Sequence, residues 1–215
     1  MTDSARGFLA SALYFALVVV PALVYLRRRG QRDKRLVLSI FAIWAAWSTA
    51  NAPIHEGAHA LAGLLVGMHI RGGQFIQHFW KGDFVHGYIL WEPASVRQFL
   101  FSTTGPYMAD ALISLFAFFW FPRKCGPFVG ALLLSVTYLR SIFDLMVNYT
   151  ADTLFGGRGD FDFLLSGYPR LIVHAVAVLI ILLSCSGAAR QILQAPNLKQ
   201  PHFVSSKVSA VDWYA

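Results

Sequence analysis

Long apolar runs dominate the pattern of hydrophobic and polar positions along the chain. There are five of them, at residues 8–26, 36–68, 99–121, 127–147 and 171–187. A helix that crosses a bilayer needs about 17–25 predominantly apolar residues, and four of the runs fit that range. Run 36–68 would measure about 50 Å as a straight helix. We expect it to protrude from the bilayer or to break near "NAP" at 51–53, because Pro53 has no backbone N–H to donate.

Two connecting segments are too long for simple turns. Residues 69–97 alternate polar and apolar side chains around "KGD", which predicts a β-hairpin between the second and third helices. Residues 148–170 are rich in Gly and Asp and predict an irregular loop. The expected fold class is an all-α polytopic membrane protein with about five transmembrane helices and one β-hairpin.

The runs also suggest three parts of the chain. Residues 1–35 would form an N-terminal transmembrane anchor and a basic loop, residues 36–170 a membrane core, and residues 171–215 a C-terminal transmembrane helix with a tail. The first run lacks a small-residue cleavage site, which indicates a retained anchor rather than a cleaved signal.

Composition supports a membrane location. Apolar residues make up 56% of the chain, charged residues 13%, and the mean hydropathy is +0.53, whereas soluble domains have roughly 45–50% apolar and about 25% charged residues. The net charge of +7 does not indicate nucleic acid, because the basic residues lie in short loops, where Lys and Arg favour the cytoplasmic side. The cluster "RRRGQRDKR" at 27–35 can also contact anionic lipid. We expect a multi-pass protein of the cell membrane. Its partner would be the lipid bilayer, and we expect no binding to nucleic acid.

The sequence "HEGAH" at 55–59 carries the candidate chemistry. His55 and His59 stand four residues apart, so both imidazoles lie on one helix face and can bind a single ion. Two neutral imidazoles suit Zn²⁺, and Glu56 suits the general base that deprotonates a metal-activated water. A chance match with satisfied polar residues is the alternative, but ionisable residues in membrane segments are costly and usually functional.

Small residues continue this pattern. Gly63 and Gly67 follow His59 at intervals of four, where small residues let another helix or strand approach closely. Further along, "STTGPYMAD" (102–110) holds a Gly-Pro step.

Together these motifs resemble the site-2 protease family of intramembrane zinc metalloproteases. That family carries H-E-x-x-H, then a small residue and glycines, and later a Gly-Pro step, commonly G-P-x-x-N, that opens the next core helix. Asp110 stands one place beyond the expected Asn. The resemblance covers roughly residues 36–165 and implies a compact member without a peptide-binding module, with a metalloprotease-like core at 36–170.

The resemblance implies a third zinc ligand, an aspartate often within N-P-x-x-x-x-D-G, which is absent here. Four aspartates are candidates: Asp144, Asp152, Asp160 and Asp162. The stretch "GGRGDFDFLL" (156–165) is similar to compact members without that motif, which favours Asp160, with Asp162 next. A glycine turn closed by an Asx cap explains the same stretch equally well.

The other two aspartates have structural explanations. Asp144 lies four residues after Arg140, so an ion pair hidden from lipid accounts for both residues. Asp152 suits a cap or a turn. By the same resemblance Asn148 is a candidate catalytic residue that donates a hydrogen bond to the developing oxyanion, although a simple helix end explains it as well. His174, alone in an apolar run, is expected to pack and hydrogen-bond rather than to bind a metal.

The expected function is that of an enzyme, a zinc-dependent endopeptidase. It would hydrolyse a peptide bond in or near a transmembrane segment of a membrane protein substrate, with Glu56 moving the proton. The substrate helix must unwind first, and an edge of the hairpin could pair with it by strand addition. Two alternatives stay open: an inactive membrane scaffold or binding protein of the same fold, and a zinc hydrolase of small amphiphiles.

Overall fold

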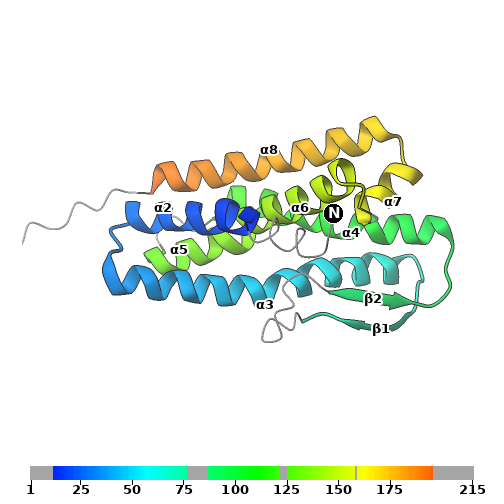
Figure 1. Cartoon of the computed structure of the whole chain (residues 1–215), viewed down its shortest axis with the longest axis horizontal. Helices are drawn as coiled ribbons and strands as arrows, with labels where there is room; N and C mark the ends of the chain where they lie inside the picture. The colour runs from blue at the N-terminus through cyan, green and yellow to red at the C-terminus, as the bar shows by residue number, and fades with distance from the viewer. Residues whose placement is uncertain (1–11, 77–86, 122–124, 158, 196–215) are drawn as a thin grey trace, which may run out of the picture.

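The chain folds into an elongated, mostly helical bundle with a small two-stranded sheet along one end (Figure 1). The structure is a computed structural model, and it describes residues 12–76, 87–121, 125–157 and 159–195. The described helices are α2 (Val20–Arg28), α3 (Asp33–Leu65), α4 (Val96–Trp120), α5 (Pro127–Leu134), α6 (Arg140–Leu154), α7 (Asp160–Gly167) and α8 (Arg170–Gln194). A π-helical turn, Phe15–Val19, leads into α2, and a second, Ser135–Leu139, joins α5 to α6.

Three of the described helical stretches are long and apolar enough to cross a membrane. They are Lys34–Leu65, Pro127–Leu154 and Arg170–Gln194. The expected mostly helical class is therefore confirmed, whereas five crossings stay a prediction. The first apolar run begins outside the described residues, and the third run became α4, which carries Asp110 and a polar stretch at 102–104.

Of the two outcomes expected for run 36–68, the break near Pro53 is wrong. Helix α3 continues through this residue as one element of 33 residues. A proline in a helix gives up its own hydrogen bond to the carbonyl four residues earlier, here that of Thr49, while the bonds on either side persist.

The helix ends at Leu65, and Gly67 follows with a φ of +77°. The N–H of Met68 donates to the carbonyl of Gly63 at 2.9 Å, and the N–H of Gly67 donates to that of Leu64 at 3.0 Å. This pair of bonds is the Schellman motif, which needs a residue in the left-handed conformation. A Cβ at Gly67 would meet nothing within 4 Å, so its expected role in close packing is wrong.

Two antiparallel strands follow α3, as the alternation of residues predicted. Strand β1 (Ile70–Gln74) pairs with β2 (Tyr88–Trp91), with Gly73 opposite Ile89. The "KGD" turn lies outside the described residues. The indole of Trp91 covers Gly63, so the expected close approach of a strand at this glycine is confirmed.

The irregular loop expected at 148–170 is largely wrong. Helix α6 runs on to Leu154, and α7 occupies Asp160–Gly167. The carboxylate of Asp152 accepts the N–H groups of Gly159 at 3.0 Å and Phe161 at 2.9 Å. These bonds cap the start of α7, because the first N–H groups of a helix have no partner within it. The capping interpretation of Asp152 is therefore confirmed.

The Gly-Pro step positions α4 against α3. A Cβ at Gly105 would touch the carbonyl oxygen of Ala58 and lie 2.9 Å from the Cβ of Ala62. Only glycine lets the two backbones approach this closely. Because Ala58 directly precedes His59, this contact sets the distance between α4 and the candidate histidines.

We predict that Gly105→Ala lowers the free energy of unfolding in detergent by about 1–3 kcal/mol, because the added methyl forces α4 away from α3. Gly57→Ala is the matched control on α3, where a Cβ meets nothing within 4 Å. Alanine there should stabilise the helix by about 0.5–1 kcal/mol. Equal effects of the two changes would contradict the close packing.

Candidate metal centre

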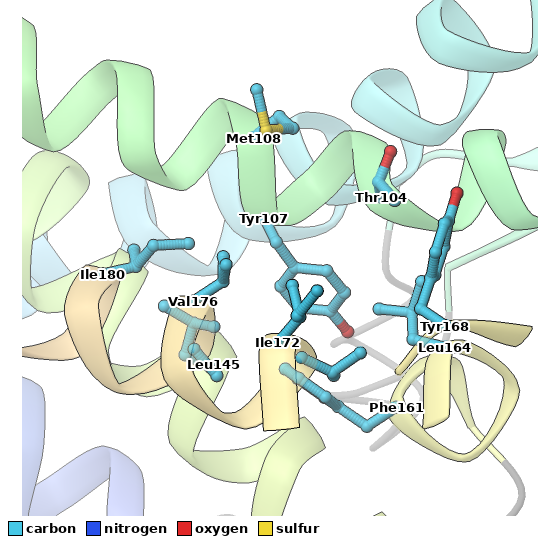
Figure 2. Close-up of a pocket in the computed structure, with 12 residues that line it drawn as sticks. Thr104, Tyr107, Met108, Leu145, Phe161, Leu164, Tyr168, Ile172, Val176 and Ile180 are labelled. Atoms are coloured by element: carbon cyan, nitrogen blue, oxygen red, sulfur yellow. The ribbon is translucent and has the colours of Figure 1, made fainter. Parts of the chain in front are cut away.

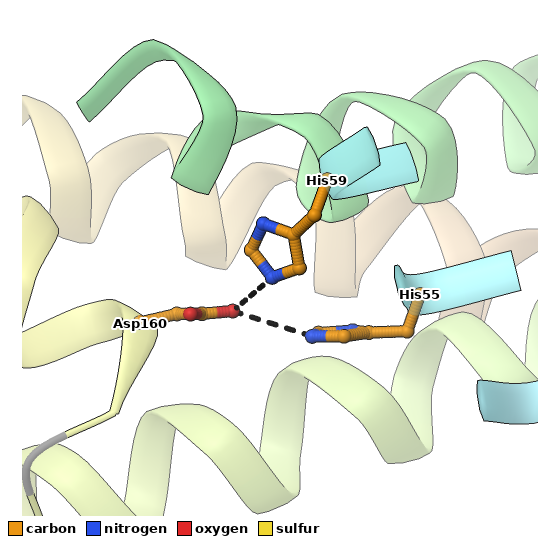
Figure 3. Close-up of side chains that lie close together, drawn as sticks. All are labelled: His55, His59 and Asp160. Atoms are coloured by element: carbon orange, nitrogen blue, oxygen red, sulfur yellow. Dashed lines mark hydrogen bonds and ion pairs between the residues drawn. The ribbon is translucent and has the colours of Figure 1, made fainter. Parts of the chain in front are cut away.

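Two histidines of α3 and the first residue of α7 point at one another (Figure 3). Asp160 Oδ2 lies 3.3 Å from His55 Nε2 and 3.0 Å from His59 Nε2. The donor atoms of the three residues all lie within 4.8 Å of one another. Ligands about 2.0–2.1 Å from a tetrahedral Zn²⁺ stand about 3.3 Å apart. The spacing therefore suits one shared ion, and Asp160 is the candidate aspartate that the fold brings to both histidines.

The His59 ring is held by a backbone carbonyl. Its Nδ1 lies 3.0 Å from the carbonyl oxygen of Ser102, which can only accept a hydrogen bond, so Nδ1 carries the proton. That carbonyl is free to accept because Pro106, four residues later in α4, has no N–H to bond it. The Ser102 hydroxyl donates back to the carbonyl of His59 at 3.0 Å. The Gly-Pro step thus fixes the orientation of a candidate ligand.

The His55 ring is held by a carboxylate instead. Its Nδ1 lies 2.8 Å from Asp144 Oδ2, on α6. Asp144 also forms the expected ion pair with Arg140, at 3.8 Å, but His55 is its closer partner. Metal-binding histidines usually donate their second ring N–H to a carboxylate or a carbonyl, which fixes the tautomer. Both histidines have such a partner, and both leave Nε2 facing Asp160.

Positive charge at the centre of this arrangement would relieve a repulsion between lone pairs. With Nδ1 protonated, each neutral imidazole presents an Nε2 lone pair, and both lone pairs face the same oxygen of Asp160. A proton on each Nε2 would remove the repulsion between these lone pairs and the Asp160 oxygen. It would also create two imidazolium rings with centroids 4.9 Å apart. One divalent cation between the three donor atoms would remove the same repulsion without placing two like charges side by side.

The acid itself is ionised. Burial alone would raise the pKa of Asp160, but with no metal bound, protonated His55 and His59 would donate hydrogen bonds and supply positive charge that hold it well below its usual range. A carboxylate must be deprotonated to bind a metal, so this direction suits a ligand. The side chains of Asp160, His55 and His59 remain 25%, 14% and 13% exposed, which leaves a route for water.

Glu56 lies beside this cluster, where α3 meets the start of β2. A Cβ at Gly87, the residue before β2, would collide with the Glu56 side chain, so the backbone of the hairpin passes close to Glu56. The charges of His55, His59 and Asp160 act on the Glu56 carboxylate. The expected base therefore stands next to the three donors, in contact with the backbone of the hairpin.

The remaining predicted site residues lie further out. Asp162 is exposed on α7. The side-chain amide of Asn148 donates to Asp144 Oδ1 at 3.0 Å, which links it to the cluster through His55, and its oxyanion role stays a prediction. His174 bonds the hydroxyl of Tyr149 at 2.7 Å, as expected of a packing residue.

Tyr107 was not predicted from the sequence. Its hydroxyl donates to Asp160 Oδ2 at 3.1 Å. Its ring lines an apolar cavity of about 200 Å³ between α4, α7 and α8, together with Phe161 and Val176 (Figure 2). Tyr107 therefore connects the Asp160 carboxylate to the apolar cavity through its hydroxyl hydrogen bond. An aromatic residue after a Gly-Pro step has no local signal that indicates this role.

Comparisons of the chain with protein family models, curated proteins and solved structures find no match. The arrangement itself offers two imidazole nitrogens and one carboxylate oxygen, with the second nitrogen of each ring already bonded. Such a set suits zinc and other divalent first-row metals, with a fourth position for water or substrate.

We predict that Asp160→Ala abolishes stoichiometric zinc binding, because the change removes one of three donors. Asp162→Ala is the matched control, since this exposed aspartate lies two residues away on the same helix. Metal content of the purified proteins, measured by mass spectrometry, checks the pair. Zinc retained at full occupancy in Asp160→Ala would rule out this residue as a ligand.

We also predict that Pro106→Ala weakens zinc binding about tenfold, within the range for loss of a ligand's hydrogen-bond partner. Alanine restores an N–H that competes with His59 for the carbonyl of Ser102. Pro53→Ala is the control, because the carbonyl that Pro53 frees belongs to Thr49, six residues before His55. Competition with a chromophoric chelator measures both affinities, and an equal loss in the two variants would contradict the explanation.

Proposed function

We propose that this chain is an intramembrane zinc metalloprotease, a compact relative of the site-2 protease family. It hydrolyses a peptide bond in or near a transmembrane segment of a membrane protein substrate. One observation carries the proposal: Nε2 of His55, Nε2 of His59 and the Asp160 carboxylate meet beside Glu56. This is the donor set of catalytic zinc sites, which use three protein ligands and leave the fourth position open.

The chemistry divides among named groups. Zinc, when bound, supplies a Lewis acid that polarises the scissile carbonyl and makes a water acidic near neutral pH. Glu56 would accept the proton of the attacking water as the water oxygen bonds to the scissile carbonyl carbon, and would return that proton to the amine as the C–N bond breaks. Asp144 and the Ser102 carbonyl keep Nδ1 of each ligand protonated throughout, so the rings cannot turn away from the centre.

The surroundings of the site suit a membrane substrate. His55 and His59 lie on α3, one of the three helices long and apolar enough to cross a bilayer. This supports a multi-pass protein of the cell membrane. Because β2 starts against Glu56, a substrate strand that adds to an edge of the two-stranded sheet would run close to the base.

We predict that Glu56→Gln keeps stoichiometric zinc and lowers cleavage of a transmembrane peptide by about 10²–10⁴-fold, the usual contribution of a positioned acid–base group. The amide cannot accept the proton, yet it has nearly the shape of the carboxylate. The measurement compares purified wild type and variant in detergent, with peptide products identified by mass spectrometry.

Three outcomes separate the candidate functions. Glu56-dependent peptide cleavage supports the protease. Glu56-dependent hydrolysis of a small ester or amide amphiphile, without peptide cleavage, would favour the amphiphile hydrolase. Full zinc occupancy without any Glu56-dependent hydrolysis would favour the inactive scaffold or binding protein.

A further inference from the structure

An ion pair deep in the bundle has no part in the proposed chemistry. Arg140 on α6 is 1% exposed, and it is bonded to Asp110 on α4, which is fully buried. Burying two charges costs several kcal/mol per ion unless their geometry and remaining hydrogen bonds compensate. Here Asp110 Oδ2 and Arg140 Nη1 find no hydrogen-bond partner among the described residues. Stability alone is therefore a poor explanation for the pair.

The pair is one end of a series of opposite charges that reaches the metal centre. Asp110 Oδ1 accepts from Arg140 and, at 3.2 Å, from the Ser141 hydroxyl. The Nη1 atom of Arg140 lies 3.8 Å from Asp144 Oδ2, and that same oxygen holds Nδ1 of His55 at 2.8 Å. The series connects α4, α6 and α3 through side chains alone.

With a divalent ion bound, the buried charges of the series would sum to zero. A divalent ion is neutralised by Asp144 and Asp160, while Arg140 and Asp110 neutralise each other. Arg140 lies between two buried acids, so it offsets the charge of Asp144 in a place that water does not reach. Asn148 supports the other oxygen of Asp144 but brings no charge.

We propose that Arg140 is a positioning residue of the metal centre. Asp110 anchors its guanidinium, the guanidinium holds the Asp144 carboxylate in place, and Asp144 turns Nε2 of His55 toward the metal. This inference rests on the metal site of the proposed function but not on peptide hydrolysis. It assigns a role to Asp110, which departs from the Gly-Pro motif of the resembled family, and to Arg140.

The test removes the pair without changing the net charge. In Asp110→Leu/Arg140→Met both charges become apolar side chains, a kind of exchange that buried ion pairs often tolerate. We expect zinc to bind about tenfold more weakly, as measured by chelator competition on the full chain in detergent. In an Asp144→Asn background the same double change should have no further effect, because the link to His55 is already altered.

Two further variants keep the test decisive. Arg140→Lys retains a cation between the acids, and its zinc affinity should stay within about threefold of wild type, since a lysine keeps the charge but loses the planar fork. If the apolar pair does not fold, Asp110→Asn/Arg140→Gln removes the same charges while keeping hydrogen-bonding groups, with the same expected loss.

The matched control is Ser114→Ala/Ser184→Ala. These two buried hydroxyls bond each other at 2.8 Å between α4 and α8, outside the series, so zinc affinity should not change. Unchanged affinity in the neutral-pair variants, or an equal loss with and without Asp144→Asn, would overturn the role of Arg140. Zinc binding without peptide cleavage contradicts the protease alone, whereas a wild-type chain that binds no zinc contradicts both proposals.

Discussion

Two imidazole nitrogens and one carboxylate oxygen converge at a point that could hold a metal ion, and four helices pack together to bring them there. The rings of His55 and His59 are each tied at Nδ1, so neither can turn its lone pair away from Asp160. The two hydrogen-bond partners come from different helices, because α4 supplies a carbonyl to His59 and α6 supplies a carboxylate to His55. Helices α3, α4, α6 and α7 must therefore pack in one relative position for the three donors to converge.

A proline inside α4 makes one of these two hydrogen bonds possible. A regular helix uses nearly all of its carbonyls internally, so it has few acceptors to offer a neighbour. Pro106 leaves the carbonyl of Ser102 unpaired within the helix, and Gly105 lets α4 come near enough for His59 to use it. In an apolar bundle, where water is scarce, an unpaired carbonyl is costly unless such a partner is present.

Much of the architecture could be predicted from local pattern. The helical class and the paired strands after α3 follow from periodicity, which depends on neighbours a few residues apart. The failures have a common cause. Pro53 was expected to break α3, and residues 148–170 to form a loop, because local propensity ignores tertiary support. The loop is shortened by Asp152, whose carboxylate caps a helix that begins eight residues later.

The sequence by itself determined that His55 and His59 share a helix face with Glu56 beside them, since a helical spacing of four places both rings on one side. Spacing alone could not choose among four aspartates, and only the family resemblance favoured Asp160 over Asp162 in the same glycine-rich stretch. The tertiary structure adds that Asp160 lies against both histidines, since it is 101 residues from His59 in the chain and only the packing of α7 brings them together. The same holds for Asp144, whose nearest partner comes from another helix rather than from its own.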